Sequence, residues 1–217
     1  RARPKAVETL RAVAESRYDD GDGGFFRYAA GRDWSDPHRE KRLVDNAALI
    51  RAFANGYLYS GDESLLDPVA GTRSFLVDRL WNGVAFGGSV APPRDDGREP
   101  RRDRTGYAGG NALAAEALLT VTAYTDADAP REYAERVLET LAASFLDGGV
   151  VSHIHPDDGG DDWTDPPTGL LADHARVVAA CATARQVLGP AAPAVDHGAG
   201  ARPVRDEAPR AVPRAPG

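Results

Sequence analysis

The chain has 217 residues, a hydrophobic fraction of 42% and a formal net charge of −7. This size and composition favour one folded domain over a disordered chain. The acidic excess excludes a general nucleic-acid-binding surface, because neutralising phosphates requires a basic face. No apolar run approaches the roughly 20 residues of a membrane-spanning helix, so we expect no membrane partner and a cytoplasmic location.

The numbers of cysteines, lysines and methionines further limit what kind of protein this is. Cys181 is the only cysteine, which excludes an intramolecular disulfide and a cysteine zinc cluster, and we expect it in the core. Lys5 and Lys41 are the only lysines, a bias typical either of a salt-adapted surface or of simple codon preference. Methionine is absent even at position 1, so we expect a fragment of a longer protein.

The first predicted elements form a helical pair. An amphipathic outer helix has apolar residues at spacings of three and four, Val7, Leu10, Val13 and Ala14. A glycine-rich turn and a short extended stretch follow. The next helix, which begins near Asp45 and reads ALIRAFANGYLY, is apolar on nearly every side and is therefore an inner, buried helix.

The same order recurs twice, with inner helices that begin near Asn111 and His174. Glycine-containing turns again separate each outer helix from the inner helix that follows, and their β-branched residues favour short strands. The outer helices carry single apolar stripes: Phe75, Leu76 and Leu80 in the second pair, and Tyr133, Val137, Leu141 and Phe145 in the third.

Stacked helix pairs with the more apolar helix inside predict an all-α fold, a partial α/α toroid of helical hairpins or a helical solenoid, with short strands between hairpins. We assign residues 1–188 to this domain. Residues 91–104 form an exposed insertion, and the proline-rich residues 189–217, including His197, form a disordered tail. Three hairpins leave apolar flanks open at both ends, so we expect self-association.

Residues 23–49, GGFFRYAAGRDWSDPHREKRLVDNAAL, resemble the signature of the thioredoxin-domain-containing family that includes spermatogenesis-associated protein 20, approximately GGFxRYSVDRDWxVPHFEKMLYDNAxL. The resemblance implies a six-hairpin toroid similar to N-acylglucosamine 2-epimerases and six-hairpin glycosidases. It also implies that a thioredoxin-like domain precedes the toroid, as a partner within the full-length chain. Ala30, Gly31, Arg39 and Arg42 depart from the signature, and the last two make the predicted mouth more polar.

Polar residues concentrate in this same stretch, at the connection into the first inner helix. We predict His38 as a catalytic acid/base group, with Glu40 or Asp33 as its partner. The alternative is a structural network in which Arg27 and Arg32 pair with nearby carboxylates and His38 binds a carbonyl. The predicted ligand-binding residues for a small-molecule sugar are Arg32, Trp34, Tyr28, Asp45, Asn46, Asn111 and His174.

Several of these residues also have a structural interpretation. Asp45 suits the N-cap of its helix, and capping is the favoured use of Asn46 and Asn111. His174 favours a hydrogen-bonded core position, and Lys41 a solvated one.

His153, His155, Asp157 and Asp158 could suggest a metal site, but a third ligand at suitable spacing is not evident and the run favours a turn. We predict no metal, and no cofactor, because nucleotide-binding and nucleophile-elbow motifs are absent. Two functions stay open: sugar binding or isomerisation, and a non-catalytic helical scaffold that presents the thioredoxin-like domain.

Overall fold

A computed structural model describes residues 2–125, 128–155 and 166–192. The helices are α1 (Ala2–Arg17), α2 (Leu43–Ser60), α3 (Leu66–Phe75), α4 (Ala108–Thr125), α5 (Asp128–Thr140) and α6 (Leu171–Val187). The strands are β1 (Tyr28–Ala29), β2 (Pro37–His38), β3 (Lys41–Arg42), β4 (Gly87–Val90), β5 (Arg102–Gly106), β6 (Leu146–Asp147) and β7 (Val150–Val151). Short 3₁₀ helices span Glu63–Leu65 and Gly189–Ala191, and π-helical turns Leu76–Leu80 and Leu141–Phe145 extend α3 and α5.

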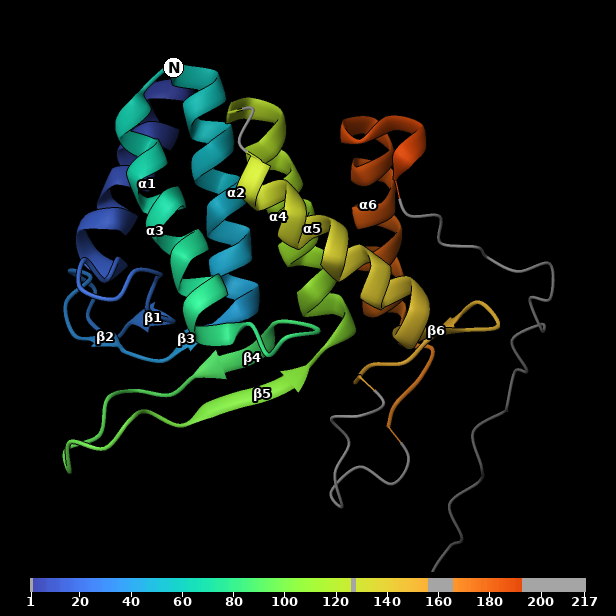
Figure 1. Cartoon of the computed structure of the whole chain (residues 1–217). Coiled ribbons are helices and arrows are strands. Elements are labelled where there is room, and N and C mark those ends of the chain that lie inside the picture. Colours follow the sequence, from blue (N-terminus) through green and yellow to red (C-terminus); the bar gives the residue numbers. More distant parts are fainter. Residues whose placement is uncertain (1, 126–127, 156–165, 193–217) are drawn as a thin grey trace, which may run out of the picture.

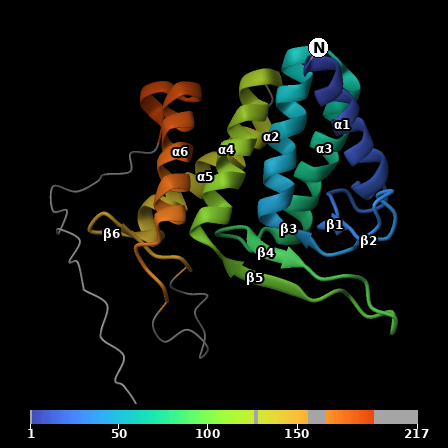
Figure 2. The same cartoon turned by 180° about the vertical axis from the view of Figure 1, so that it is seen from behind.

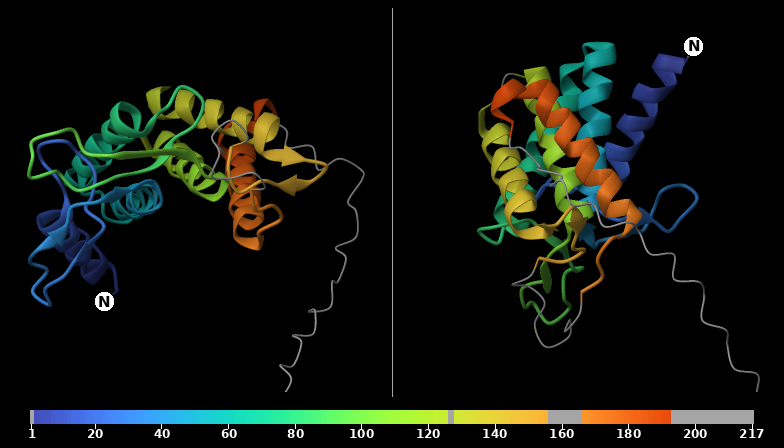
Figure 3. Two further views of the ribbon diagram at one scale, coloured as in Figure 1. Left: turned by 90° about the horizontal axis from the view of Figure 1, so that it is seen from below. Right: turned by 90° about the vertical axis from the view of Figure 1, so that its right-hand side faces the viewer.

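Outer helices α1 and α3 both pack against inner helix α2, and outer helix α5 packs against inner helix α4. Outer and inner helices alternate along the chain in three successive pairs, α1–α2, α3–α4 and α5–α6, which we call hairpins, and this order confirms the predicted partial toroid. They follow an open arc in which the middle inner helix, α4, packs against both α2 and α6 (Figure 3). All three inner helices begin at the end of the molecule where the strands gather (Figures 1 and 2). We call this the short-strand end.

The core lies between the inner and outer helices, and its largest buried side chains are phenylalanines, Phe25, Phe53, Phe75, Phe86 and Phe145. The first two turns of α4 are buried on every side, as its continuous apolar sequence predicts, because α2 and α6 flank it. Cys181 on α6 is half-buried and packs against this core.

An asparagine near the start of each of the first two inner helices fastens the extended segment that follows the outer helix. Asn46 Oδ1 accepts a hydrogen bond from Phe25 N at 2.6 Å, and Asn46 Nδ2 donates to Phe25 O at 3.2 Å. Asn111 repeats the contact with Phe86, at 2.8 and 2.9 Å. Both asparagines also donate to the carbonyl four residues earlier, at 2.8 Å to Arg42 and 3.0 Å to Tyr107. We call these contacts amide clamps.

The third hairpin has a histidine in the same role. His174 Nδ1 contacts Leu170 O at 3.1 Å, and His174 Nε2 accepts from Val151 N at 3.3 Å. The predicted capping of Asn46 and Asn111 is wrong, since their amides bind strand backbone and not the free N–H groups of their own helices. Both asparagines are fully buried, so their amides do not face a ligand cavity.

The 91–104 segment is only in part a loop. Residues 102–104 belong to β5, which pairs antiparallel with β4, and β4 pairs in turn with β3. The loop at residues 91–101 therefore projects from a three-stranded sheet. Of the predicted tail, residues 189–191 form a 3₁₀ helix, whereas residues 193–217, with His197, lie outside the described residues.

The amide clamp predicts a large loss of stability in Asn111→Ala. The substitution leaves the buried N–H and C=O of Phe86 unpaired, so we expect a loss of about 3 kcal/mol in the free energy of unfolding. Asn55→Ala is the control, because Asn55 only accepts a half-buried bond from Tyr124, and should cost about 1 kcal/mol. Equal urea midpoints for the two variants would contradict the clamp.

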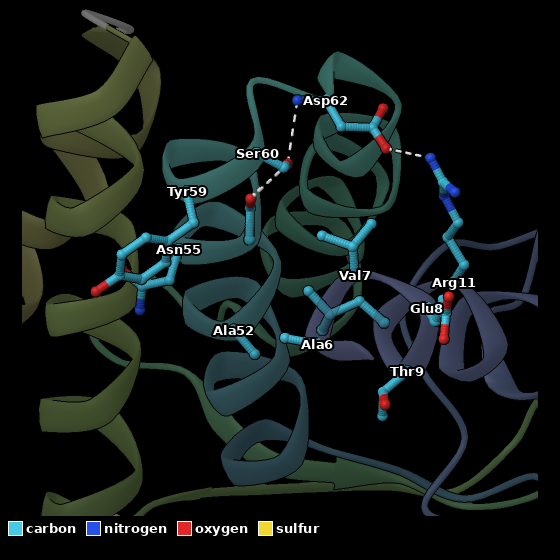
Figure 4. A pocket seen from close by; sticks show the side chains of 12 residues that line it. Ala6, Val7, Glu8, Thr9, Arg11, Ala52, Asn55, Tyr59, Ser60 and Asp62 are labelled. Carbon is cyan, nitrogen blue, oxygen red and sulfur yellow. Dashed lines mark hydrogen bonds and ion pairs between the residues drawn. The ribbon is translucent and has the colours of Figure 1, made fainter. Parts of the chain in front are cut away.

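Both ends of the arc present apolar surface. A groove of about 970 Å³ lies between α1 and α2, where Val7, Leu10, Ala52 and Tyr59 line it (Figure 4). At the other end, α6 exposes 84% of Leu171 and 51% of Val178. Such faces favour burial against a partner.

We propose that in this chain the α6 face of a second copy covers the α1–α2 groove. Sedimentation velocity should show a concentration-dependent dimer for the wild type, and Val178→Asp should shift the equilibrium to monomer, because it places a charge in the interface. Glu139→Asp, on the neighbouring helix α5, is the control. A wild type that stays monomeric at every concentration would refute the proposal.

Candidate functional site

The structure brings together four of the polar residues between Arg27 and Glu40. β1 and β2 pair antiparallel with Tyr28 opposite His38, and the two rings stack with centroids 4.9 Å apart and an interplanar angle of 14°. Arg27 Nη1 donates to Glu40 Oε2 at 2.8 Å. The predicted network is therefore confirmed for Arg27 and Glu40.

His38 lies beside that ion pair. Its Nδ1 is 4.0 Å from Glu40 Oε2, and it is buried without a hydrogen-bond partner in the described part of the chain. The predicted bond from His38 to a carbonyl is thus not formed at Nδ1. An imidazole with a carboxylate in close reach is an acid/base arrangement that a small movement would complete.

An open groove of about 560 Å³ passes this pair. One wall comes from the first hairpin's connector and includes Tyr28, Asp36 and His38, and the other comes from Pro92, Pro93 and Asp95 in the loop between β4 and β5. The sequence predicts residues 91–104 only as an exposed insertion. Only the pairing of β3 with β4, distant in sequence, brings that loop to the connector.

Asp33 and Trp34 belong to the tight loop between β1 and β2. Asp33 Oδ1 accepts from Ser35 Oγ at 2.6 Å and Ser35 N at 3.2 Å, which holds the pKa of Asp33 below its ordinary value. Trp34 has a φ of 65°, a left-handed conformation that is strained for a bulky residue. No hydrogen bond or ion pair joins Asp33 to His38 among the described residues, so its carboxylate fixes the turn.

The remaining predicted ligand residues lie outside the groove. Trp34 is 41% exposed but does not line it, and neither does Arg32, which is also exposed. Asn46, Asn111 and His174 are occupied in the clamps. Of the predicted site residues, only Tyr28 and His38 line the groove, with Glu40 directly behind His38.

Asp45 is not the N-cap that was predicted. Helix α2 begins at Leu43, so Arg42 occupies the cap position and Asp45 is the third helical residue. The Asp45 carboxylate takes two hydrogen bonds from Arg42, at 2.7 and 2.8 Å. The arginine that departs from the family signature therefore pairs with a carboxylate on the first turn of its own helix.

Lys41 is buried and not solvated, contrary to the prediction. Its side chain reaches under the connector, where Nζ donates to Asp19 Oδ2 at 2.7 Å and to Gly23 O at 2.6 Å. Asp22 Oδ2 lies 3.7 Å away. Burial works to raise the pKa of Asp19, but the hydrogen bond and charge of Lys41 outweigh it and hold that pKa below 3.8, its ordinary value.

Metal binding finds no geometric basis in the described residues, where no group of three His, Cys, Asp or Glu side chains could hold an ion. Asp157 and Asp158 lie outside the described residues. Across the same described segments, every helix is too short or too polar to cross a membrane. Sequence reasoning missed a further polar contact in the third hairpin, between His153 and Asp173.

Comparison with known sequences confirms the predicted resemblance over part of the chain. Human spermatogenesis-associated protein 20 is 32% identical over 105 residues, which are 46% of this chain and 13% of that protein. The mouse protein of the same name is 36% identical over 81 residues, 37% of this chain and 10% of the relative. No family model matches the chain. The aligned part is thus a small share of much longer relatives.

Solved structures share the fold at low sequence identity. A D-mannose isomerase has a TM-score of 0.67 and 17% identity, with 85% of this chain aligned to 46% of that chain. A cellobiose 2-epimerase from Spirochaeta thermophila has a TM-score of 0.64 and 20% identity, with 85% of this chain aligned to 47% of that chain. A family 76 glycoside hydrolase from a bovine Bacteroides thetaiotaomicron strain has a TM-score of 0.64 and 11% identity, with 84% of this chain aligned to 38% of that chain. The chain therefore has about half of a six-hairpin toroid.

The buried Lys41 contact predicts a pH-dependent stability difference. Because the pKa of Asp19 is depressed in the folded state, its contribution is present above pH 3.8 and is lost as the pH falls through the lowered value. Asp19→Asn should lower the free energy of unfolding by about 2 kcal/mol at pH 7 and by much less at pH 2.5, in urea titrations at both pH values. Asp20→Asn, at the exposed next residue, should leave the free energy of unfolding unchanged at both pH values. If Asp19→Asn lowered that free energy equally at both pH values, the result would argue against the ion pair.

Proposed function

We propose that the short-strand end binds a carbohydrate in the groove between the β1–β2 hairpin and residues 92–95. The observation that carries the proposal is the Tyr28 ring, which is 46% exposed and held flat against His38 in a groove with carboxylates on both walls. A sugar offers an apolar C–H face to an aromatic ring and hydroxyl groups to carboxylates. An aromatic surface with polar groups placed around it is typical of small-molecule sites.

The acid/base chemistry we propose there uses His38 and Glu40. Isomerisation or epimerisation of a sugar requires a group that removes a proton next to a carbonyl and a group that returns one. A neutral imidazole can accept a proton, and the Glu40 carboxylate, 4.0 Å from His38 Nδ1, would stabilise the imidazolium that results. Arg27 holds the Glu40 carboxylate in place.

The fold supports this proposal only in general terms. The compared structures include enzymes named for mannose and cellobiose, but their identities of 11–20% establish a shared fold and not a shared substrate. The argument for a sugar therefore depends on the groove itself.

A second candidate function is a non-catalytic platform that packs against a thioredoxin-like domain in a longer protein. One observation favours it: many residues of the signature have internal structural roles. Asn46 clamps a strand, Lys41 pins the turn before β1, and Arg42 and Asp45 pair with each other. Such a motif can be maintained by folding alone.

A ligand panel separates the two functions. We expect D-mannose, D-glucose or cellobiose to raise the melting temperature of the chain, since a ligand at about 100 times its Kd adds roughly 2.7 kcal/mol to stability. Tyr28→Ala should weaken binding about tenfold by removing the stacking surface. Trp34→Ala, an exposed aromatic outside the groove, is the control and should bind normally.

His38→Ala tests the chemistry separately. It should abolish proton exchange between the sugar and D₂O, followed by NMR, while the variant still binds the sugar. If no sugar shifts the melting temperature but a separately purified thioredoxin-like domain binds the chain, the platform function replaces the sugar-binding one.

A further inference from the structure

The third hairpin holds a histidine against a buried carboxylate. His153 Nδ1 lies 2.7 Å from Asp173 Oδ2, and Asp173 is only 4% exposed. The backbone of His153 is fixed on both sides, because its N–H donates to Pro167 O at 2.8 Å and its carbonyl accepts from Ala108 N at 2.9 Å. Both the ring and its partner are therefore held by neighbouring elements.

The contact with Asp173 determines which ring nitrogen of His153 can accept a hydrogen bond from a ligand. An ionised carboxylate only accepts hydrogen bonds, so the neutral imidazole carries its proton on Nδ1 and leaves a lone pair on Nε2. The His153 side chain is 30% exposed, and Nε2 has no hydrogen-bond partner among the described residues. An imidazole oriented through Nδ1 by a buried carboxylate is the arrangement that prepares a histidine to accept a proton or a hydrogen bond.

A cation lies next to this pair. Arg176, one turn after Asp173 on α6, is exposed and forms no ion pair with any described residue. Its Cδ lies 3.4 Å from the point where a side chain on Gly109 would begin, and the Asp173 carboxylate approaches the same point. Gly109 is the second residue of α4, so the absence of a side chain there lets the Asp173 carboxylate, with Arg176 beside it, come close to the partly positive start of that helix.

Further groups bound the same region. The Tyr107 ring is 5.4 Å from the His153 ring, and burial raises the pKa of Tyr107, so its hydroxyl stays protonated at neutral pH. Asp103 lies beside Tyr107, and its carboxylate accepts from Thr105 N at 3.0 Å. Asp173 is buried, whereas Arg176, which lies beside it, is exposed.

We infer that His153, Asp173 and Arg176 form a binding site for a small anionic hydroxy compound, such as a sugar phosphate or a sugar acid. Arg176 pairs with the phosphate or carboxylate, and His153 Nε2 accepts a hydrogen bond from a ligand hydroxyl. Asp173 is a positioning residue that fixes the tautomer. This site is separate from the Tyr28–His38 groove and does not depend on the function proposed for it.

The test is an NMR titration of the ¹⁵N-histidine-labelled chain, with His153→Gln used to assign the His153 signals. Wild type should show the Nδ1–H tautomer. D-glucose 6-phosphate and D-gluconate should each shift the His153 Nε2 signal saturably, and the stronger of the two identifies the preferred anion. D-glucose should not shift it, because it lacks the charge, and inorganic phosphate should bind at least tenfold more weakly than glucose 6-phosphate, because it lacks the hydroxyl groups of the sugar.

Matched variants separate binding from a purely structural contact. Arg176→Gln should weaken both anions about tenfold without a change in tautomer, whereas Arg185→Gln, at the other end of α6, should bind like the wild type. Asp173→Asn should change the tautomer, and if it fails to fold, His153→Gln supplies the loss of binding. The inference is wrong if neither anion produces a saturable shift, if Arg176→Gln binds as well as the wild type, or if phosphate alone binds equally well.

Discussion

The short-strand end depends on one interaction, the amide clamp between the start of an inner helix and the strand that precedes it. An asparagine side chain has one donor group and one acceptor group in the geometry of a backbone amide, so it can pair with a strand residue as a neighbouring strand would. Asn46 does this for Phe25 and Asn111 for Phe86. Without the clamp, those backbone groups would be buried and unpaired, at a cost that the single bridges formed by Phe25 and Phe86 would not offset.

The clamps also determine where chemistry is possible. The segments between outer and inner helices all lie at the short-strand end (Figure 1), where the amide clamps and, in the third hairpin, His174 hold them against the inner helices. In the first hairpin, Lys41 adds a second anchor to Asp19 and Gly23, so the β1–β2 hairpin projects beyond the helices with Tyr28 and His38 at its paired ends. The groove then forms where the β4–β5 loop meets that projection.

The sequence predicts the arc well, because apolar periodicity distinguishes helices buried on all sides from helices buried on one side. It predicts the site less well. A buried lysine such as Lys41 is indistinguishable in sequence from a solvated one, since its partner Asp19 lies 22 residues away. The approach of Pro92 to His38 likewise depends on the pairing of β3 with β4. Asp173 is the third residue of its inner helix, as Asp45 is, but its partner His153 precedes it by 20 residues, so the sequence does not show the contact.

The residue that precedes Asn46, Asn111 or His174 occupies an equivalent position in each hairpin but has a different role in each. Asp45, Gly110 and Asp173 are each the third residue of their inner helix, a position where a carboxylate suits the helix dipole. Arg42 donates two hydrogen bonds to the Asp45 carboxylate, so that carboxylate pairs with a neighbour in the sequence. Glycines at the start of α4 let Leu43 of α2 approach from one side and Asp173 from the other. Asp173, approaching α4 without an adjacent arginine bound to it, is the carboxylate able to orient a histidine, so the equivalent position serves folding in the first hairpin and can serve a ligand in the third.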